Sequence, residues 1–193
     1  MKILSTALDR VVHFFYPAYC LHCNEKVEKA HHLLCSSCFE QLEWIDRSQR
    51  CPSCWGAKKC QHCSSLHPHC SLFEPCGPIL ELHREFLKTK RGKTLASLMV
   101  VALYKTSWAF PEVIVPLIDS PFPKQEPLYS LGKELAVLLS CSLSLPNSKL
   151  QDKKILLITD ILWKTEEVMK EKQRLADFFP EKIFTFALID LRF

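Results

Sequence analysis

Cysteine is the residue type whose spacing in this sequence points most directly to chemistry. The chain has 193 residues and eleven cysteines. A C-x2-C pair places two thiolates and the amides of its turn around one ion, and two such pairs complete a tetrahedral zinc site. Four pairs of this spacing therefore predict two structural Zn²⁺ ions. The pairs are Cys20/Cys23, Cys35/Cys38, Cys51/Cys54 and Cys60/Cys63.

The sequence leaves the grouping of these pairs open. Joining them in chain order is the simplest arrangement, and a cross-braced arrangement, with the first pair joined to the third, is the alternative. A single pair could be a redox couple, but four pairs within 44 residues favour metal. Cys70 and Cys76 lack this spacing, so we interpret them as ordinary thiols. The nearby histidines are interpreted as surface residues rather than ligands: His22, His31, His32, His62, His67 and His69.

The N-terminus predicts a docked amphipathic helix and not an export signal; a membrane-surface helix is the alternative, which the few lysines and arginines on its polar face disfavour. Apolar residues recur at helical spacing through residues 1–17, but Asp9 and Arg10 interrupt the apolar stretch and no cleavage site follows. The apolar runs elsewhere are too short to span a bilayer. We therefore expect a cytoplasmic protein without a membrane span, in which thiols stay reduced and available to metal.

The charge pattern excludes a general polyanion-binding role for the cysteine-rich part. The formal net charge is +4 with thiols counted as neutral, and eight thiolates with two zinc ions bring it near zero. Residues 1–76 carry 8 basic and 7 acidic side chains, so metallation takes this part from +1 to about −3. The densest basic cluster contains Lys88, Lys90, Arg91 and Lys93. It is either a solvated helix end or the main electrostatic contact with single-stranded nucleic acid.

The second half of the chain alternates between helical and strand patterns. Strands that alternate with helices imply right-handed crossovers and a parallel sheet. Apolar, β-branched runs predict the strands, and 3.6-residue periodicity predicts the helices. Strands are expected at 112–118, 153–161 and 182–190, and helices at 77–90, 94–105, 128–145 and 165–179.

Several segments resemble the competence protein F (ComF) family. "FFYPAYCLHC", "LLCSSCFEQL", "RCPSCWG" and "CQHC" are similar to its four knuckles, and "GPILELHREFLKTKRGKTLASLM" to its Gly-Pro helix and basic stretch. "VIVPLI" and "KKILLITDI" resemble its two characteristic strands. The resemblance implies a small zinc-ribbon region followed by an α/β domain, with a reduced, mostly parallel sheet like that of type I phosphoribosyltransferases.

The chain departs from that family where a phosphate would bind. The family has two adjacent acids followed by Thr-Thr-Gly-x-Thr, and the remnants of this loop are Thr159, Asp160, Lys164 and Thr165. Glycine is scarce, so amides cannot approach a phosphate closely. Glu166 and Glu167 satisfy the helix dipole and repel an anion. We therefore expect no catalytic residues, and we expect Trp163 to fill the vacated site.

These observations predict three regions in the chain and are compatible with three functions. We expect an N-terminal helix (1–17), a double zinc ribbon (18–76) and a degenerate phosphoribosyltransferase-like domain (77–193). The resemblance implies a DNA-uptake accessory protein that binds single-stranded DNA or competence-machinery proteins. The alternatives are an active phosphoribosyltransferase and a zinc-ribbon adaptor with no nucleic-acid role. A basic groove with exposed aromatics, for which Trp55 and Trp108 are candidates, would favour the first.

Overall fold

The computed structural model describes residues 18–29, 32–51, 68–106 and 108–192. The helix expected at 1–17 lies outside these residues. The helices are α2 (Ser36–Glu40), α3 (Gly77–Thr89), α4 (Lys93–Tyr104), α5 (Pro127–Leu139) and α6 (Thr165–Ala176). Single 3-10 turns lie at Arg47–Gln49, Pro123–Gln125 and Ser148–Leu150. The strands are β1 (His69–Phe73), β2 (Val113–Pro116), β3 (Ser142–Leu143), β4 (Lys154–Leu162) and β5 (Lys182–Asp190).

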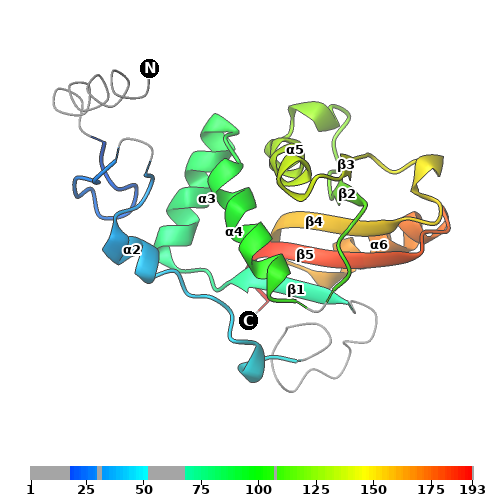
Figure 1. The fold of residues 1–193 in the computed structure, drawn as a ribbon, viewed down its shortest axis with the longest axis horizontal. Helices are drawn as coiled ribbons and strands as arrows, with labels where there is room; N and C mark the ends of the chain where they lie inside the picture. The colour runs from blue at the N-terminus through cyan, green and yellow to red at the C-terminus, as the bar shows by residue number, and fades with distance from the viewer. Residues whose placement is uncertain (1–17, 30–31, 52–67, 107, 193) are drawn as a thin grey trace.

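One sheet of five parallel strands forms the centre of the fold, in the order β1-β5-β4-β2-β3 (Figure 1). β4 and β5 pair along almost their whole length, from Lys154↔Lys182 to Leu162↔Asp190. The parallel α/β sheet and the three strands expected from the sequence are confirmed. β1 and β3, the two edge strands, were not expected.

The helix expected at 128–145 is too long. α5 ends at Leu139 because Ser140 takes a left-handed conformation, with φ of 54°. The chain then turns into β3, which pairs with β2. Apolar residues continue through this turn, so the helical pattern in the sequence did not show where the helix ends.

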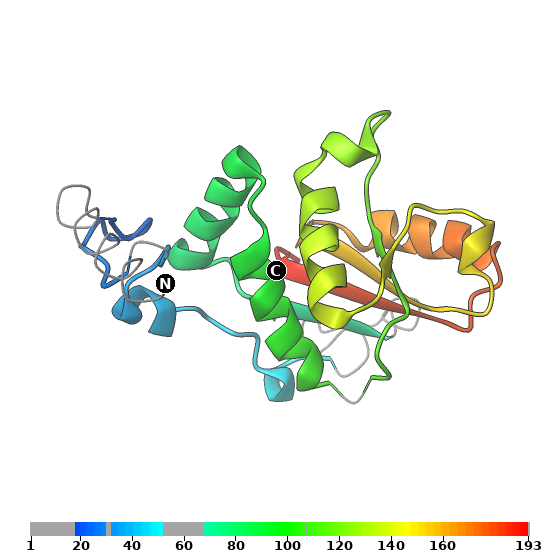
Figure 2. The ribbon, with the colours of Figure 1, turned by 45° about the horizontal axis from the view of Figure 1, so that its top comes forward.

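Helices cover both faces of the sheet (Figure 2). Side chains of α3, α4 and α5 pack on the face that carries Leu156, Ile158 and Phe186. Val168 and Leu175 of α6 pack on the opposite face. The helices that follow β2 and β4 thus lie on opposite faces, so the strand order reverses between these two strands. In open α/β folds, ligands bind at the carboxyl ends of the strands at such a point.

The α3–α4 connection is compact because a glycine allows α5 to approach. α3 buries Ile79, Leu82 and Phe86, which share one helical face. A Cβ on Gly92 would lie 3.0 Å from the Cα of Leu131 in α5, so a side chain there would collide with backbone.

The cysteine-rich region is attached to the edge of the sheet. The amide of Ile45 donates to the carbonyl of Leu72, and that of Glu74 to the carbonyl of Glu43. Between these bonds, Trp44 pairs with Phe73, with ring centroids 4.4 Å apart. β1 therefore belongs to the sheet although it precedes residue 76, the boundary expected between the two domains.

Candidate functional site

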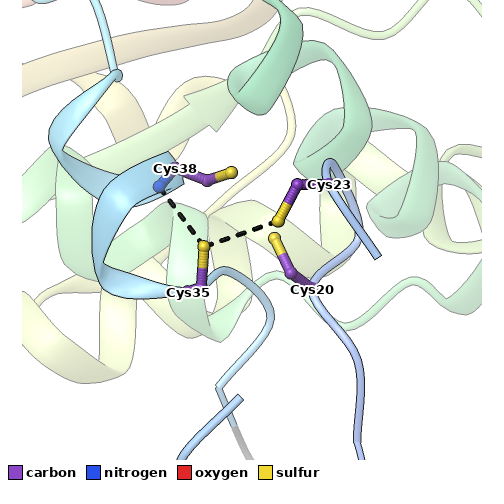
Figure 3. Close-up of side chains that lie close together, drawn as sticks. All are labelled: Cys20, Cys23, Cys35 and Cys38. Carbon is purple, nitrogen blue, oxygen red and sulfur yellow. Dashed lines mark hydrogen bonds between the residues drawn. The ribbon is translucent and has the colours of Figure 1, made fainter. Parts of the chain in front are cut away.

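Four cysteines meet at the N-terminal end of the described chain, next to α2 (Figure 3). The sulfurs of Cys20, Cys23, Cys35 and Cys38 all lie within 4.8 Å of one another. Bonds of about 2.3 Å to a central zinc would place tetrahedral sulfurs roughly 3.8 Å apart. The first two of the four predicted pairs therefore come together in a set that fits one zinc ion.

Local backbone geometry explains how each pair is positioned. The amide of Cys20 donates to the carbonyl of Glu25, and Asn24 closes the turn with φ of 60°. Asparagine tolerates this left-handed conformation better than most residues. In the second pair, Cys35 is the N-cap of α2, and the amide of Cys38 donates to the Cys35 sulfur over 3.4 Å. Both turns thus direct sulfur atoms and amides towards the same centre.

The surroundings of the four thiols differ, which affects their protonation. Burial alone would raise the pKa of Cys20, but backbone amides of Cys23, Cys35 and His22 lower it to about 6. Burial raises the pKa of Cys38, and the neighbouring thiols add to that increase. A metal ion must therefore displace protons from some of the thiols when it binds. Four sulfurs leave no coordination position for water, which is the arrangement of a structural zinc site and not of a catalytic one.

His22 links the four cysteines to the α/β fold. Its Nδ1 lies 3.3 Å from the Cys38 sulfur, at hydrogen-bond distance. A Cβ placed on Gly77, the first residue of α3, would lie only 2.5 Å from His22 Nε2. The imidazole thus occupies the space between the four-cysteine cluster and the start of α3. A histidine in a C-x-H-C turn is the only signal for this contact in the sequence.

The second predicted zinc site is described only in part. Cys51 is buried, whereas Cys54, Cys60 and Cys63 lie outside the described residues. The second ion stays a prediction.

The remnants of the predicted phosphate loop are placed inside the fold. Thr159 and Asp160 belong to β4, which continues to Leu162. Thr159 is buried, and its hydroxyl donates to the carbonyl of Ile161 over 3.1 Å. Asp160 accepts hydrogen bonds from the Ile161 amide and from His83 Nε2, each over 2.9 Å.

The groups that follow β4 do not form a phosphate cradle. Lys164 is exposed and stands at the N-cap of α6, and Thr165 is the first residue of that helix. Glu166 and Glu167 occupy the first turn and are exposed. The expectation that Trp163 packs into the vacated site is wrong, because its side chain is 64% exposed. Leu162, its neighbour, is buried and fills the core instead.

His83 was missed by the sequence analysis. It lies on α3, is buried, and reaches an acid 77 residues away in the chain. This contact holds the carboxylate of Asp160 against α3, on the face of the sheet opposite α6. Nothing in the spacing of the two residues could have revealed it.

The four predicted nucleic-acid residues lie together on the turn between α3 and α4. Lys88, Lys90, Arg91 and Lys93 are all exposed. Lys90 ends α3 in a left-handed conformation, and its ammonium donates to the carbonyl of Gln125 over 2.7 Å. Trp108 does not offer an exposed ring for stacking on a base, because it stacks on Phe184 with ring centroids 5.0 Å apart. Trp55 lies outside the described residues.

A buried polar group on the α6 face of the sheet was also missed. His69 of β1 is 2% exposed, against the expectation of a surface residue, and its Nε2 lies 2.8 Å from the Ser71 hydroxyl. Burial lowers the pKa of His69 to about 3, so the imidazole is neutral. Asp190 is buried as well and pairs with Arg192 over 2.5 Å.

Comparisons with known proteins add little to this geometry. No protein-family model matches the chain, and no curated protein matches it. Among 15 similar chains of solved structures is hypoxanthine-guanine phosphoribosyltransferase from Schistosoma mansoni in complex with IMP, with a TM-score of 0.34 and 16% identity. The similarity covers 54% of this chain and 66% of that enzyme, slightly less than two thirds of its length. We draw no function from a similarity of this size. Among the described residues, no helix is long and apolar enough to cross a membrane.

Proposed function

We propose that this chain is a ComF-like accessory protein of DNA uptake, stabilised by zinc, that binds single-stranded DNA and does not catalyse phosphoribosyl transfer. The carboxyl end of β4 is the observation that carries this proposal. In an α/β fold of this kind, a phosphate ligand would be expected at that end of the sheet. Here the polar groups of β4 bond to one another and to α3.

Three features of this edge support the proposed absence of catalysis. The carboxylate of Asp160 is engaged by His83, and the hydroxyl of Thr159 is engaged by its own strand. No glycine lies in residues 154–168, where backbone amides would have to surround a phosphate. The two glutamates in the first turn of α6 add like charge beside any anion placed there.

Single-stranded DNA is favoured as the partner because of the α3–α4 turn. Four exposed cations within six residues provide a local positive charge that the rest of the chain does not match. The cysteine-rich region does not offer one, since the hollow of about 430 Å³ beside it is lined by Glu40 and Glu43. Phosphate contacts by lysine and arginine supply most of the sequence-independent affinity for nucleic acid.

Two titrations of the full zinc-loaded chain test the proposal. Fluorescence anisotropy with a labelled 20-nucleotide thymidine strand should show binding that weakens as salt is added. Changing Lys88, Lys90, Arg91 and Lys93 to glutamine should lower the affinity. It should also reduce the slope of log K against log salt by up to about 2.8, at ~0.7 for each lost phosphate contact. Calorimetry with phosphoribosyl diphosphate and magnesium should show no binding up to millimolar concentrations.

A charge-matched variant provides the control. Lys29, Lys149, Lys170 and Lys182 are exposed lysines outside α3, α4 and α5, and changing all four to glutamine alters the net charge by the same amount. This variant should keep most of the DNA affinity. A micromolar dissociation constant for phosphoribosyl diphosphate would restore the enzyme as the function. Absence of DNA binding by the wild-type chain would leave the zinc-ribbon adaptor.

A further inference from the structure

The solvent-facing side of α4 continues the basic turn as a stripe of defined composition. Thr94, Ser97, Val101 and Tyr104 are exposed, at spacings of three, four and three residues, and therefore share one helical face. The opposite face is buried in the core: Leu95, Ala96, Leu98, Met99, Ala102 and Leu103. α4 thus presents a narrow exposed surface that starts at the basic turn and ends at Tyr104. We call this surface the α4 stripe.

Aromatic rings stand at the far end of the α4 stripe. Tyr104 is 68% exposed, and Phe110 is 53% exposed in the loop that follows. Their ring centroids lie 5.1 Å apart in an edge-to-face arrangement, with 66° between the planes. The ammonium of Lys105, next in the chain, lies 5.0 Å from the ring centroid of Trp44. A fifth cation therefore lies against Trp44, and its residue follows Tyr104 in the chain.

The stripe carries positive charge without any acid of its own. Between Glu85 and Glu112 the sequence contains no aspartate or glutamate, but it contains five lysines and arginines. Glu112 is paired with Lys153, and Glu81 of α3 with Arg84. The stretch that forms the turn, the stripe and the aromatic end thus carries only positive charges, four at the turn and one at Lys105.

We propose that the α4 stripe is a binding platform for single-stranded DNA, in which the α3–α4 turn holds the phosphates and unpaired bases stack on Tyr104 and Phe110. This proposal rests on the proposed function, binding of single-stranded DNA, and names the surface that would bind the strand. α4 rises about 16 Å from Lys93 to Tyr104. At the ~3.4 Å rise of one DNA strand, this length covers about five nucleotides.

The chemistry of the stripe distinguishes single strands from other partners. Aromatic side chains stack on bases whose faces are open, and a duplex keeps those faces inside its own stack. Between its ends the stripe presents the hydroxyl groups of Thr94 and Ser97; that of Ser97 donates to the carbonyl of Lys93 over 2.9 Å and can still accept a hydrogen bond. Among the described residues, Val101 and Tyr104 are the large apolar side chains of the stripe and Phe110 lies beside its end, which is too small an apolar surface for a stable protein interface.

The test separates the platform from the proposed function. Anisotropy titrations with the labelled thymidine 20-mer compare the wild-type chain with Tyr104→Ala/Phe110→Ala and with Trp163→Ala. Trp163 is a similarly exposed aromatic residue that precedes α6, on the other face of the sheet. Zinc content and far-ultraviolet circular dichroism verify that each variant is folded. The double variant should bind about tenfold or more weakly with an unchanged salt slope, whereas Trp163→Ala should bind as the wild type does.

Each other outcome overturns part of the account. If the wild type binds and the double variant binds equally well, the platform is wrong and the proposed function stands. If the wild type binds a duplex of the same length as tightly, the contact is with phosphates alone and the stacking assignment is wrong. If the wild type binds no DNA, the platform and the proposed function both fail. If this wild-type chain self-associates in analytical ultracentrifugation and the double variant does not, the α4 stripe binds a second copy of the chain instead of DNA.

Discussion

The four-cysteine cluster and the parallel sheet should reach an ordered structure by different means. The described residues of 18–45 contain one five-residue helix and isolated bridges, and two of their six buried apolar residues, Cys20 and Cys38, belong to the four-cysteine cluster. β2, β4 and β5 are instead buried on both faces by apolar side chains. The first region has only four buried aliphatic side chains, Val27, Leu34, Leu42 and Ile45, so we expect its order to depend on a bound zinc ion. The sheet has that surface and should not need the ion.

Removal of zinc should produce the largest difference between the two regions. Structural zinc contributes on the order of 10 kcal/mol to the folding of a small site. Chelation should therefore remove the hydrogen-exchange protection of amides in 18–45, while amides of β4 and β5 keep theirs. Cys35→Ser should reproduce this pattern without a chelator. Cys141→Ser changes a partly buried cysteine outside the cluster and should leave both regions protected. Equal loss of protection in the sheet would show that the two regions fold as one unit.

A change in the core should have the reverse effect. Ile158 of β4 is fully buried beneath the helices, and Ile158→Ala should lower the free energy of unfolding by about 2–5 kcal/mol. Urea denaturation measures this loss, and metal analysis of the folded variant should find the zinc content unchanged. The matched control is Val137→Ala, because Val137 of α5 is 70% exposed. This change should alter the free energy of unfolding little. If Ile158→Ala folds but has lost its zinc, the cysteine-rich region and the sheet do not fold independently of each other.

Acid should weaken the sheet through His69. Burial lowers the pKa of His69 to about 3 in the folded chain, whereas an unfolded histidine has a pKa of about 6.5. Below pH ~6.5 the unfolded state therefore binds a proton that the folded state does not bind. This contribution to stability is complete above pH ~6.5 and is lost as the pH falls towards 3. At pH 5 the loss is about 2 kcal/mol.

The measurement is urea denaturation of the wild type and of His69→Gln at pH 7 and pH 5. The difference in unfolding free energy between the two pH values should be smaller in the variant by about 2 kcal/mol. His32→Gln, at a position in the cysteine-rich region, serves as the comparison and should retain the wild-type dependence. Identical pH dependence in all three chains would show that His69 does not carry this proton.

The smallest effect is expected where the two regions touch. Gly77→Ala places a Cβ against His22 Nε2, so the imidazole must leave the Cys38 sulfur. Because the collision is with the end of one side chain, the cost should be about 1 kcal/mol. In a His22→Ala background the same change should be neutral or slightly stabilising, since alanine favours a helix more than glycine does. A double-mutant cycle that gives no coupling energy would mean that His22 does not join the regions.

The sequence predicted those parts of the structure that depend on neighbours in the chain. The C-x2-C spacing located the cluster because each pair is closed by a local turn. β2, β4 and β5 were expected because buried parallel strands are continuous apolar runs. β1 was missed because its five residues include His69 and Ser71, polar side chains that the fold buries.

Contacts between distant residues could not be predicted in this way. His83 and Asp160 meet only because α3 packs beside β4. The sequence pointed to Asp160 but not to its partner, so we expected a vacated site that Trp163 would fill. The structure instead leaves this tryptophan exposed. The carboxylate of Asp160 accepts a hydrogen bond from His83 of α3. Similarly, Trp108 was offered as an exposed aromatic before the fold placed it against Phe184.

Native mass spectrometry of the purified chain tests most directly whether an ion held by four thiolates builds the N-terminal region. The wild type should carry at least one zinc ion, and two if Cys51, Cys54, Cys60 and Cys63 hold the second. Cys35→Ser should carry one ion fewer, and Cys141→Ser should match the wild type. A wild-type chain that carries no zinc while residues 18–45 remain protected from hydrogen exchange would contradict the account.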